Sequence, residues 1–200
     1  MRVFITGSTR GFGLELAKAF WRAKYEPTLN GRSKLTFNTP WNFKQCRMEE
    51  LTREDFMEYS PDIIINNGFN KADCFGSLGG QVHVLQEAIS YFYDRGGGKI
   101  INVNSSKGLV ADVDCPEYAM AKWGLRGYSE SVKFGAYKNG INIIDIYPGA
   151  INIGMGAHRD DTDELIDAKE LSEFIVTMCE TKKFIVSTIH FNRVGVKNAE

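Results

Sequence analysis

The sequence has few of the residues that build metal sites or disulfide frameworks. Its 200 residues contain only four cysteines and three histidines, and no two cysteines form a C-x-x-C pair. The cysteines lie far apart, at Cys46, Cys74, Cys115 and Cys179. Zinc sites need closely spaced ligands, and dense disulfide frameworks belong to small secreted chains. We therefore expect four reduced thiols and no metal site.

The sequence also lacks a long apolar run and an excess of charge of either sign. No stretch is long and apolar enough to cross a bilayer, and the chain begins on a strand-like run, residues 2–6, without a signal peptide. The formal net charge of −1 gives no reason to expect a basic surface for nucleic acid. We expect a cytoplasmic protein that acts on a small molecule, with no membrane and no nucleic acid as partner.

Short apolar runs alternate along the chain with amphipathic stretches. The hydrophobic fraction of 43% allows a sizeable core in one domain. Several runs lack polar alternation, as expected of parallel strands that are buried on both faces. The expected strands are Val3–Thr6, Tyr25–Asn30, Phe43–Cys46, Asp62–Asn66, Lys99–Asn104, Ile141–Tyr147 and Lys183–Ile189.

Apolar residues spaced by three and four positions predict helices between these strands. The expected helices are Phe12–Ala23, Ser77–Asp94, Tyr118–Lys138 and one around Leu171–Met178. Pro40 disfavours a full helix in residues 31–46, and the glycines of residues 67–78 predict a loop. The order predicts an α/β fold: a Rossmann-type doubly wound parallel sheet of about seven strands. We expect a single domain over residues 1–200, in which residues 150–200 carry a short substrate loop, the last helix and the last strand.

A glycine-rich segment joins the first predicted strand to the first predicted helix. Such glycines let the backbone approach a pyrophosphate, and the helix N-terminus supplies unpaired N–H groups and the positive end of its dipole. No G-K-[ST] follows, which disfavours a P-loop nucleotidase. An ordinary structural turn can contain the same glycines. The candidate cofactor-binding residues are Gly7, Ser8, Thr9, Arg10, Gly11, Phe12 and Gly13.

Tyr118 and Lys122 lie four residues apart on a predicted helix and therefore share one face. A nearby ammonium favours the phenolate and lowers the tyrosine pKa from about 10 toward the range useful for proton transfer. Ser105 follows a predicted strand, at the edge where ligands of open α/β sheets bind, thirteen residues before Tyr118. Each pattern alone is common, because an exposed helix pair or a helix cap has the same residues.

In their order and spacing these residues resemble the short-chain dehydrogenase/reductase family. The resemblance spans the chain, from T-G-x-x-x-G-x-G through Asn66-Asn67-Gly68, where the family has N-N-A-G, to Pro148-Gly149. It implies that Tyr118 is the general acid, that Lys122 binds the nicotinamide ribose and tunes Tyr118, and that Ser105, favoured over Ser106 by spacing, binds the substrate oxygen. The further cofactor-binding residues that it implies are Asn66, Asn67, Gly68, Tyr118, Lys122, Pro148, Gly149, Ile151 and Ile153.

The sequence departs from the family pattern at several positions. The N-N-A-G element lacks its alanine, Ile153 replaces a threonine, and Arg47 or Met48 stands where an aspartate near the adenine is usual. No asparagine occurs near residues 77–78, where the family has its catalytic Asn, which holds a water that links the lysine to solvent. Ser77, a backbone carbonyl or a looser water would have to replace it. The second helix and the substrate-covering segments look trimmed.

Arg10 and Arg32 are expected beside the adenine ribose, without an acidic residue to accept from a free 2′-hydroxyl. Two guanidiniums suit a 2′-phosphate, so the sequence predicts NADP(H) over NAD(H). The leading hypothesis is an NADPH-dependent oxidoreductase that reduces a carbonyl or imine of a small substrate by hydride transfer. A non-catalytic NADP(H)-binding or redox-sensing protein is the alternative. A sugar-nucleotide epimerase or dehydratase is disfavoured by the short region after Pro148.

Aromatic residues on more than one face of helices 77–94 and 118–138 predict a homodimer or homotetramer, since the resembling family pairs these two helices across a twofold axis. The segment Asn152–Asp167 is expected to lie over the substrate. It contains His158, Arg159 and an acidic run at residues 160–164 that we expect to be solvated, although Arg159 could meet an acidic substrate.

Overall fold

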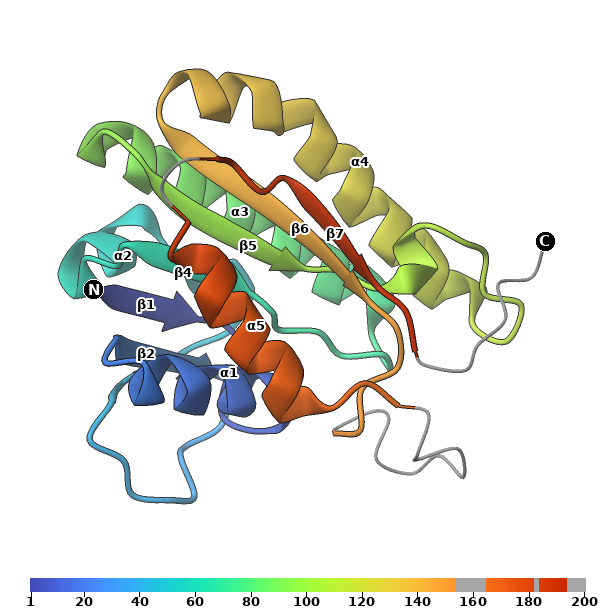
Figure 1. Cartoon of the computed structure of the whole chain (residues 1–200), viewed down its shortest axis with the longest axis horizontal. Coiled ribbons are helices and arrows are strands. Elements are labelled where there is room, and N and C mark those ends of the chain that lie inside the picture. The colour runs from blue at the N-terminus through green and yellow to red at the C-terminus, as the bar shows by residue number, and fades with distance from the viewer. Residues whose placement is uncertain (154–164, 182–183, 194–200) are drawn as a thin grey trace.

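The computed structural model describes residues 1–153, 165–181 and 184–193. Within these residues, seven strands form one sheet in the order β3-β2-β1-β4-β5-β6-β7, and every pairing is parallel. The predicted Rossmann-type doubly wound sheet is therefore confirmed (Figure 1). The strands are β1 (Arg2–Ile5), β2 (Glu26–Gly31), β3 (Asn42–Gln45), β4 (Ile63–Asn66), β5 (Gly98–Val103), β6 (Ile141–Pro148) and β7 (Thr188–Phe191).

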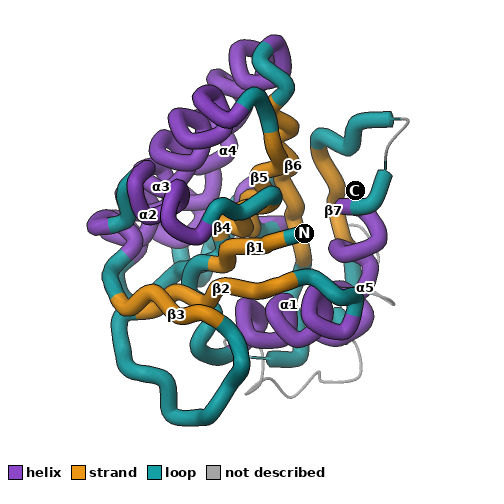
Figure 2. Tube along the Cα trace, turned by 90° about the vertical axis from the view of Figure 1, so that its left-hand side faces the viewer, coloured by secondary structure: helices purple, strands orange, loops and turns teal. Residues whose placement is uncertain are grey.

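Helices cover both faces of the sheet (Figure 2). Helices α1 (Gly11–Arg22) and α5 (Ala168–Cys179) pack on one face. Helices α2 (Arg53–Tyr59), α3 (Cys74–Arg95) and α4 (Pro116–Lys138) pack on the other. Two short 3₁₀ turns, η1 (Met48–Glu50) and η2 (Ser106–Gly108), follow β3 and β5. In the described part of the chain, none of the helices has the length and hydropathy needed to cross a lipid bilayer.

Two apolar cores result from this layering, and the sheet separates them. The core under α1 and α5 contains Leu16, Phe20 and Ile175, and the core under α3 contains Leu85 and Phe92. The three consecutive isoleucines of β4 are all buried, with alternate members contributing to the two cores. This explains why the central strands have apolar runs without polar alternation.

The structure corrects three sequence predictions. Helix α2 was not predicted, because its seven residues contribute one buried side chain, Phe56. Helix α3 begins at Cys74, so the predicted loop is limited to residues 67–73; the Asp73 side chain caps the helix by accepting from the Gly76 N–H. The last strand begins at Thr188 rather than at Lys183, which lies outside the described residues. As predicted, residues 32–41 form a loop (Figure 2).

Candidate functional site

The glycine-rich loop joins β1 to α1 at the carboxyl edge of the sheet. Gly7 and Gly11 adopt φ angles of 59° and 58°, which glycine adopts far more readily than other residues. A Cβ atom on Gly7 would come within 2.5 Å of the Gly68 Cα, so this loop packs tightly against the turn after β4. Among the described residues, no side chain caps the start of α1 at Arg10. The loop and the uncapped first turn of α1 therefore fit the pyrophosphate of a dinucleotide.

Two of the predicted cofactor residues have side chains that bind within the fold. The Asn67 Nδ2 donates to the Thr6 and Gly7 carbonyl oxygens at 3.0 and 3.2 Å. The Ser8 hydroxyl donates to the Ile5 carbonyl at 2.6 Å and accepts from the Asn30 N–H at 3.0 Å. These contacts hold the glycine-rich loop in its conformation. Both side chains therefore shape the loop through contacts within the protein.

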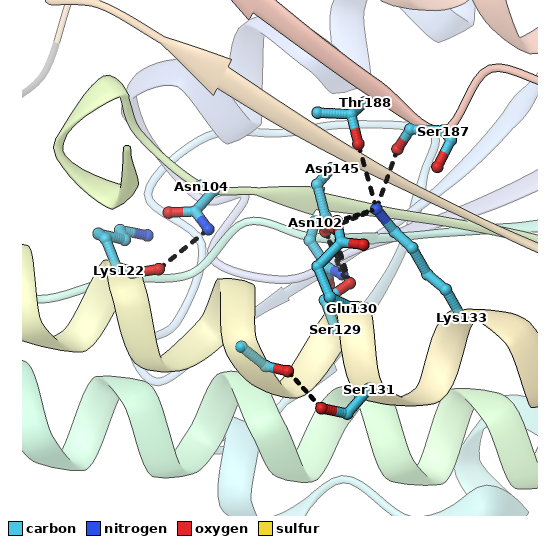
Figure 3. Close-up of polar contacts among 11 residues, drawn as sticks. Asn102, Asn104, Lys122, Ser129, Glu130, Ser131, Lys133, Asp145, Ser187 and Thr188 are labelled. Atoms are coloured by element: carbon cyan, nitrogen blue, oxygen red, sulfur yellow. Dashed lines mark hydrogen bonds and ion pairs between the residues drawn. The ribbon is translucent and has the colours of Figure 1, made fainter. Parts of the chain in front are cut away.

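Ser105 and Lys122 both lie at the end of β5. Ser105 follows β5 and begins η2, where its hydroxyl accepts from the Lys107 N–H at 3.2 Å. Lys122, on α4, is only 2% exposed, and its Nζ donates to the Val103 carbonyl at 3.2 Å. Asn104 fixes the helix against the strand, because its Nδ2 donates to the Lys122 carbonyl at 3.1 Å (Figure 3).

Tyr118 completes this group, one turn before Lys122 on α4. Burial raises the pKa of Tyr118 above its ordinary value, and a hydrogen bond with the Ser105 side chain opposes that rise. The expected lowering of the Tyr118 pKa by Lys122 is wrong for this structure. Burial also lowers the pKa of Lys122 to about 7, so the ammonium carries only part of its charge near neutral pH.

The low pKa of Lys122 predicts how stability depends on pH. Between about pH 7 and the ordinary lysine pKa of 10.5, the unfolded chain binds more protons at this position than the folded protein does. The free energy of unfolding of the wild type, relative to Lys122→Met, should therefore rise with pH across that window. Urea unfolding at pH 7 and pH 9.5 measures this difference. Lys138→Met, an exposed site on the same helix, should show no such rise; a difference that falls with pH would contradict the assignment.

Phe69, which sequence reasoning missed, covers the Lys122 ammonium. Its ring centroid lies 4.2 Å from the Lys122 Nζ and 5.3 Å from the Tyr118 ring centroid. The Lys71 Nζ lies 5.4 Å from the same Tyr118 ring. The only available signal was an aromatic residue directly after Asn66-Asn67-Gly68.

Gln81 is the second residue that sequence reasoning missed. It is buried on α3, one turn after Ser77, and its Oε1 accepts from the Lys122 Nζ at 3.3 Å. Ser77, suggested above as a replacement for the family's Asn, instead exchanges hydrogen bonds with the backbone of Asn70. The His83 ring is turned to the Leu51 carbonyl. The sequence feature that could have identified Gln81 is its position as a single amide side chain within an apolar helical stripe.

The remaining predicted residues lie around the same edge of the sheet. Arg10 and Arg32 are exposed, and within the described ranges neither forms an ion pair, whereas Arg47 pairs with Glu49.

The segment after β6, which includes Ile151 and Ile153, is held by a bridge between Ile151 and Ile166. Pro148 ends β6, and the Gly149 N–H donates to the Phe191 carbonyl. His158, Arg159 and the acidic run lie outside the described residues. All four cysteines, each at a described position, are free thiols.

The chain is similar in sequence or in fold to several dehydrogenases and reductases. A family model described as short chain dehydrogenase matches residues 76–164. The D-beta-hydroxybutyrate dehydrogenase of Rhizobium meliloti is 25% identical over 90% of this chain and 84% of its own. The 3-ketoacyl-(acyl-carrier-protein) reductase of Brucella melitensis, solved with NADH, superposes with a TM-score of 0.80 at 15% identity over 96% of both chains. The alcohol dehydrogenase of Thermococcus sibiricus, solved with 5-hydroxy-NADP, gives 0.79 at 15% identity over 98% of this chain and 97% of that one.

Proposed function

We propose that this chain is a member of the short-chain dehydrogenase/reductase family and that it is an NADPH-dependent reductase of a carbonyl or imine on a small substrate. The observation that carries the proposal is that the Tyr118 side chain forms a hydrogen bond with Ser105 and has the Lys122 Nζ 5.9 Å from its ring centroid, at the end of β5. The glycine loop stands at the same carboxyl edge of the sheet. We take residues 1–200 as one cofactor-binding domain.

In this proposal, some residues of the site bind the cofactor and the substrate, and Tyr118 transfers the proton. The first turn of α1 would hold the pyrophosphate, Lys122 the nicotinamide ribose, and residues 148–153 would flank the nicotinamide. A bound nicotinamide dinucleotide supplies the hydride. The Ser105 hydroxyl donates a hydrogen bond to the substrate oxygen, and the Tyr118 hydroxyl delivers the proton to it. The raised pKa of Tyr118 supports reduction, because the phenol keeps its proton at neutral pH.

The test is NADPH oxidation, followed by absorbance, with a panel of small ketones, aldehydes and imines. Ser105→Ala should slow any turnover that is found, because it removes a hydrogen bond to the substrate oxygen. Tight NADPH binding without turnover of any member of a broad panel would favour the binding-protein alternative. NADH in a parallel panel measures the cofactor preference.

Arg32→Ala is expected to weaken NADPH binding about ten- to a hundredfold, because it removes a charge-assisted hydrogen bond to the 2′-phosphate. NADH binding should change little, since NADH has no phosphate at that position. Isothermal titration calorimetry of both nucleotides measures the gap. Arg22→Ala, at the far end of α1, serves as the matched control. Equal affinities of the wild type for NADPH and NADH would contradict the preference.

We also propose that the protein is a homodimer or a homotetramer. Exposed aromatic residues stand on both long helices: Tyr93 on α3 is 62% exposed, and Trp123 and Phe134 on α4 are 50% and 70% exposed. Such an apolar face on paired helices suits an interface between copies. Light scattering at micromolar concentration should give at least twice the monomer mass, and Trp123→Glu with Phe134→Glu should lower it. A wild type that is strictly monomeric would overturn the proposal.

A further inference from the structure

Gln81 is the side-chain acceptor for the Lys122 ammonium among the described residues. Its Oε1 lies 3.3 Å from the Lys122 Nζ, and the second acceptor is the Val103 carbonyl at 3.2 Å. An ammonium can only donate, so the amide must turn its oxygen toward Lys122. The Gln81 Nε2 then points to the Asn66 carbonyl, at 3.5 Å. Both residues are buried, so this contact is shielded from water.

From the backbone carbonyl of Gln81, a chain of two side-chain amides, those of Asn66 and Asn102, continues across the sheet. The Asn66 Nδ2 donates to the Gln81 carbonyl at 2.7 Å and to the Asn102 Oδ1 at 3.1 Å. The Asn102 Nδ2 donates in turn to the Asp145 Oδ1 at 2.8 Å. Figure 3 shows the far end of this chain, where Ser129 and Lys133 also bind Asp145.

The buried Asp145 carboxylate sets the direction of this chain. An ionised carboxylate only accepts, so Asn102 must present its Nδ2 to Asp145 and its Oδ1 to Asn66. Asn66 is thereby held as a donor, and it fixes the backbone of α3 at Gln81. The Asn66 Oδ1 is buried and has no hydrogen-bond partner within the described residues. Leaving a buried acceptor unpaired is costly, which indicates that the donor orientation of Asn66 is enforced.

We propose that Gln81 is a positioning residue for Lys122: anchored by Asn66, Asn102 and Asp145, it holds the Lys122 side chain in place and favours its charged form. The proposal rests on the proposed function, in which Lys122 holds the nicotinamide ribose. An amide carries no mobile proton at neutral pH, so Gln81 orients Lys122 and does not relay protons. The ionisable groups that face Lys122 are Tyr118 on its own helix and the Cys74 thiol on α3, and the Phe69 ring covers it.

The experiment follows the titration of Lys122 itself by NMR, in the full chain with labelled lysine and no added nucleotide. Lys122→Met assigns the Lys122 signal. Gln81→Met should lower the Lys122 midpoint by about one pH unit, because a hydrogen bond to a charged group is lost. Gln81→Glu should raise it by about one unit or more, because it introduces an opposite charge. Gln86→Met, an exposed glutamine on the same helix, should leave it unchanged.

A purely structural role of Gln81 would not shift the midpoint in opposite directions. An unchanged midpoint in both variants, or the same direction in both, overturns the proposal. If Gln81→Met does not fold, the wild type provides the test. The chemical shifts of its Gln81 side-chain amide should change with the Lys122 titration. Amide shifts that stay constant across this titration contradict the proposal. Because no substrate or nucleotide takes part, this failure would leave the reductase function standing. Conversely, expected shifts without any nicotinamide-dependent turnover would count against the function alone.

Discussion

Tyr118→Phe is expected to slow the reduction of the enzyme's carbonyl substrate by about 10²–10⁴-fold, because the variant loses its general acid. NADPH binding should be retained, since the variant leaves unchanged the glycine loop that would hold the pyrophosphate. The ring packing against Phe69 is also kept, because only one oxygen is removed. Steady-state rates, together with NADPH fluorescence titrations, separate the two effects.

The matched control for this prediction is Tyr137→Phe, on the same helix. Tyr137 is 58% exposed and belongs to the last turn of α4, far along the helix from Tyr118. Its loss should leave both turnover and NADPH binding unchanged. Full activity of Tyr118→Phe on a good substrate would show that another group delivers the proton. Loss of NADPH binding in Tyr118→Phe would instead indicate that the phenol holds the cofactor.

The sequence predicted those parts of the fold whose signal lies within a few neighbouring residues. The buried strand β4 and the glycine loop belong to this class, because an apolar run and a glycine pattern suffice to identify them. Helix α2 and strand β7 do not. The first buries only Phe56, and the second is a four-residue strand with no fully buried residue, so neither has a strong apolar signal.

The candidate site was predictable in its residue types but not in its electrostatics. Tyr118 and Lys122 could be paired by helical spacing, but their pKa values depend on burial, which their own spacing does not give. Gln81 lies 41 positions from Lys122 in sequence, and only the packing of α3 on α4 brings the two together. The same holds for Phe69, whose ring reaches Lys122 from the loop after β4.

Asp145 and Lys133 form a further contact that the sequence does not reveal. Asp145 lies on β6 and is fully buried, and its Oδ2 is 2.7 Å from the Nζ of Lys133, on α4, whose side chain is 13% exposed. Ser129 and Asn102 donate to the same carboxylate. Lys133 is therefore the one cation of the described residues that forms an ion pair with this buried charge.

Lys133→Met is expected to lower the free energy of unfolding by about 3 kcal/mol or more, because it leaves the Asp145 carboxylate buried without its counter-charge. Adding Asp145→Asn to this variant should restore most of the loss, since a neutral amide needs no cation and still accepts from Ser129. Urea unfolding of the wild type and of the single and double variants measures both values, with Lys138→Met as the exposed control. A single variant as stable as the wild type would show that Ser129 and Asn102 alone satisfy the carboxylate. A double variant less stable than Lys133→Met would show that the negative charge of Asp145 stabilises the fold by itself.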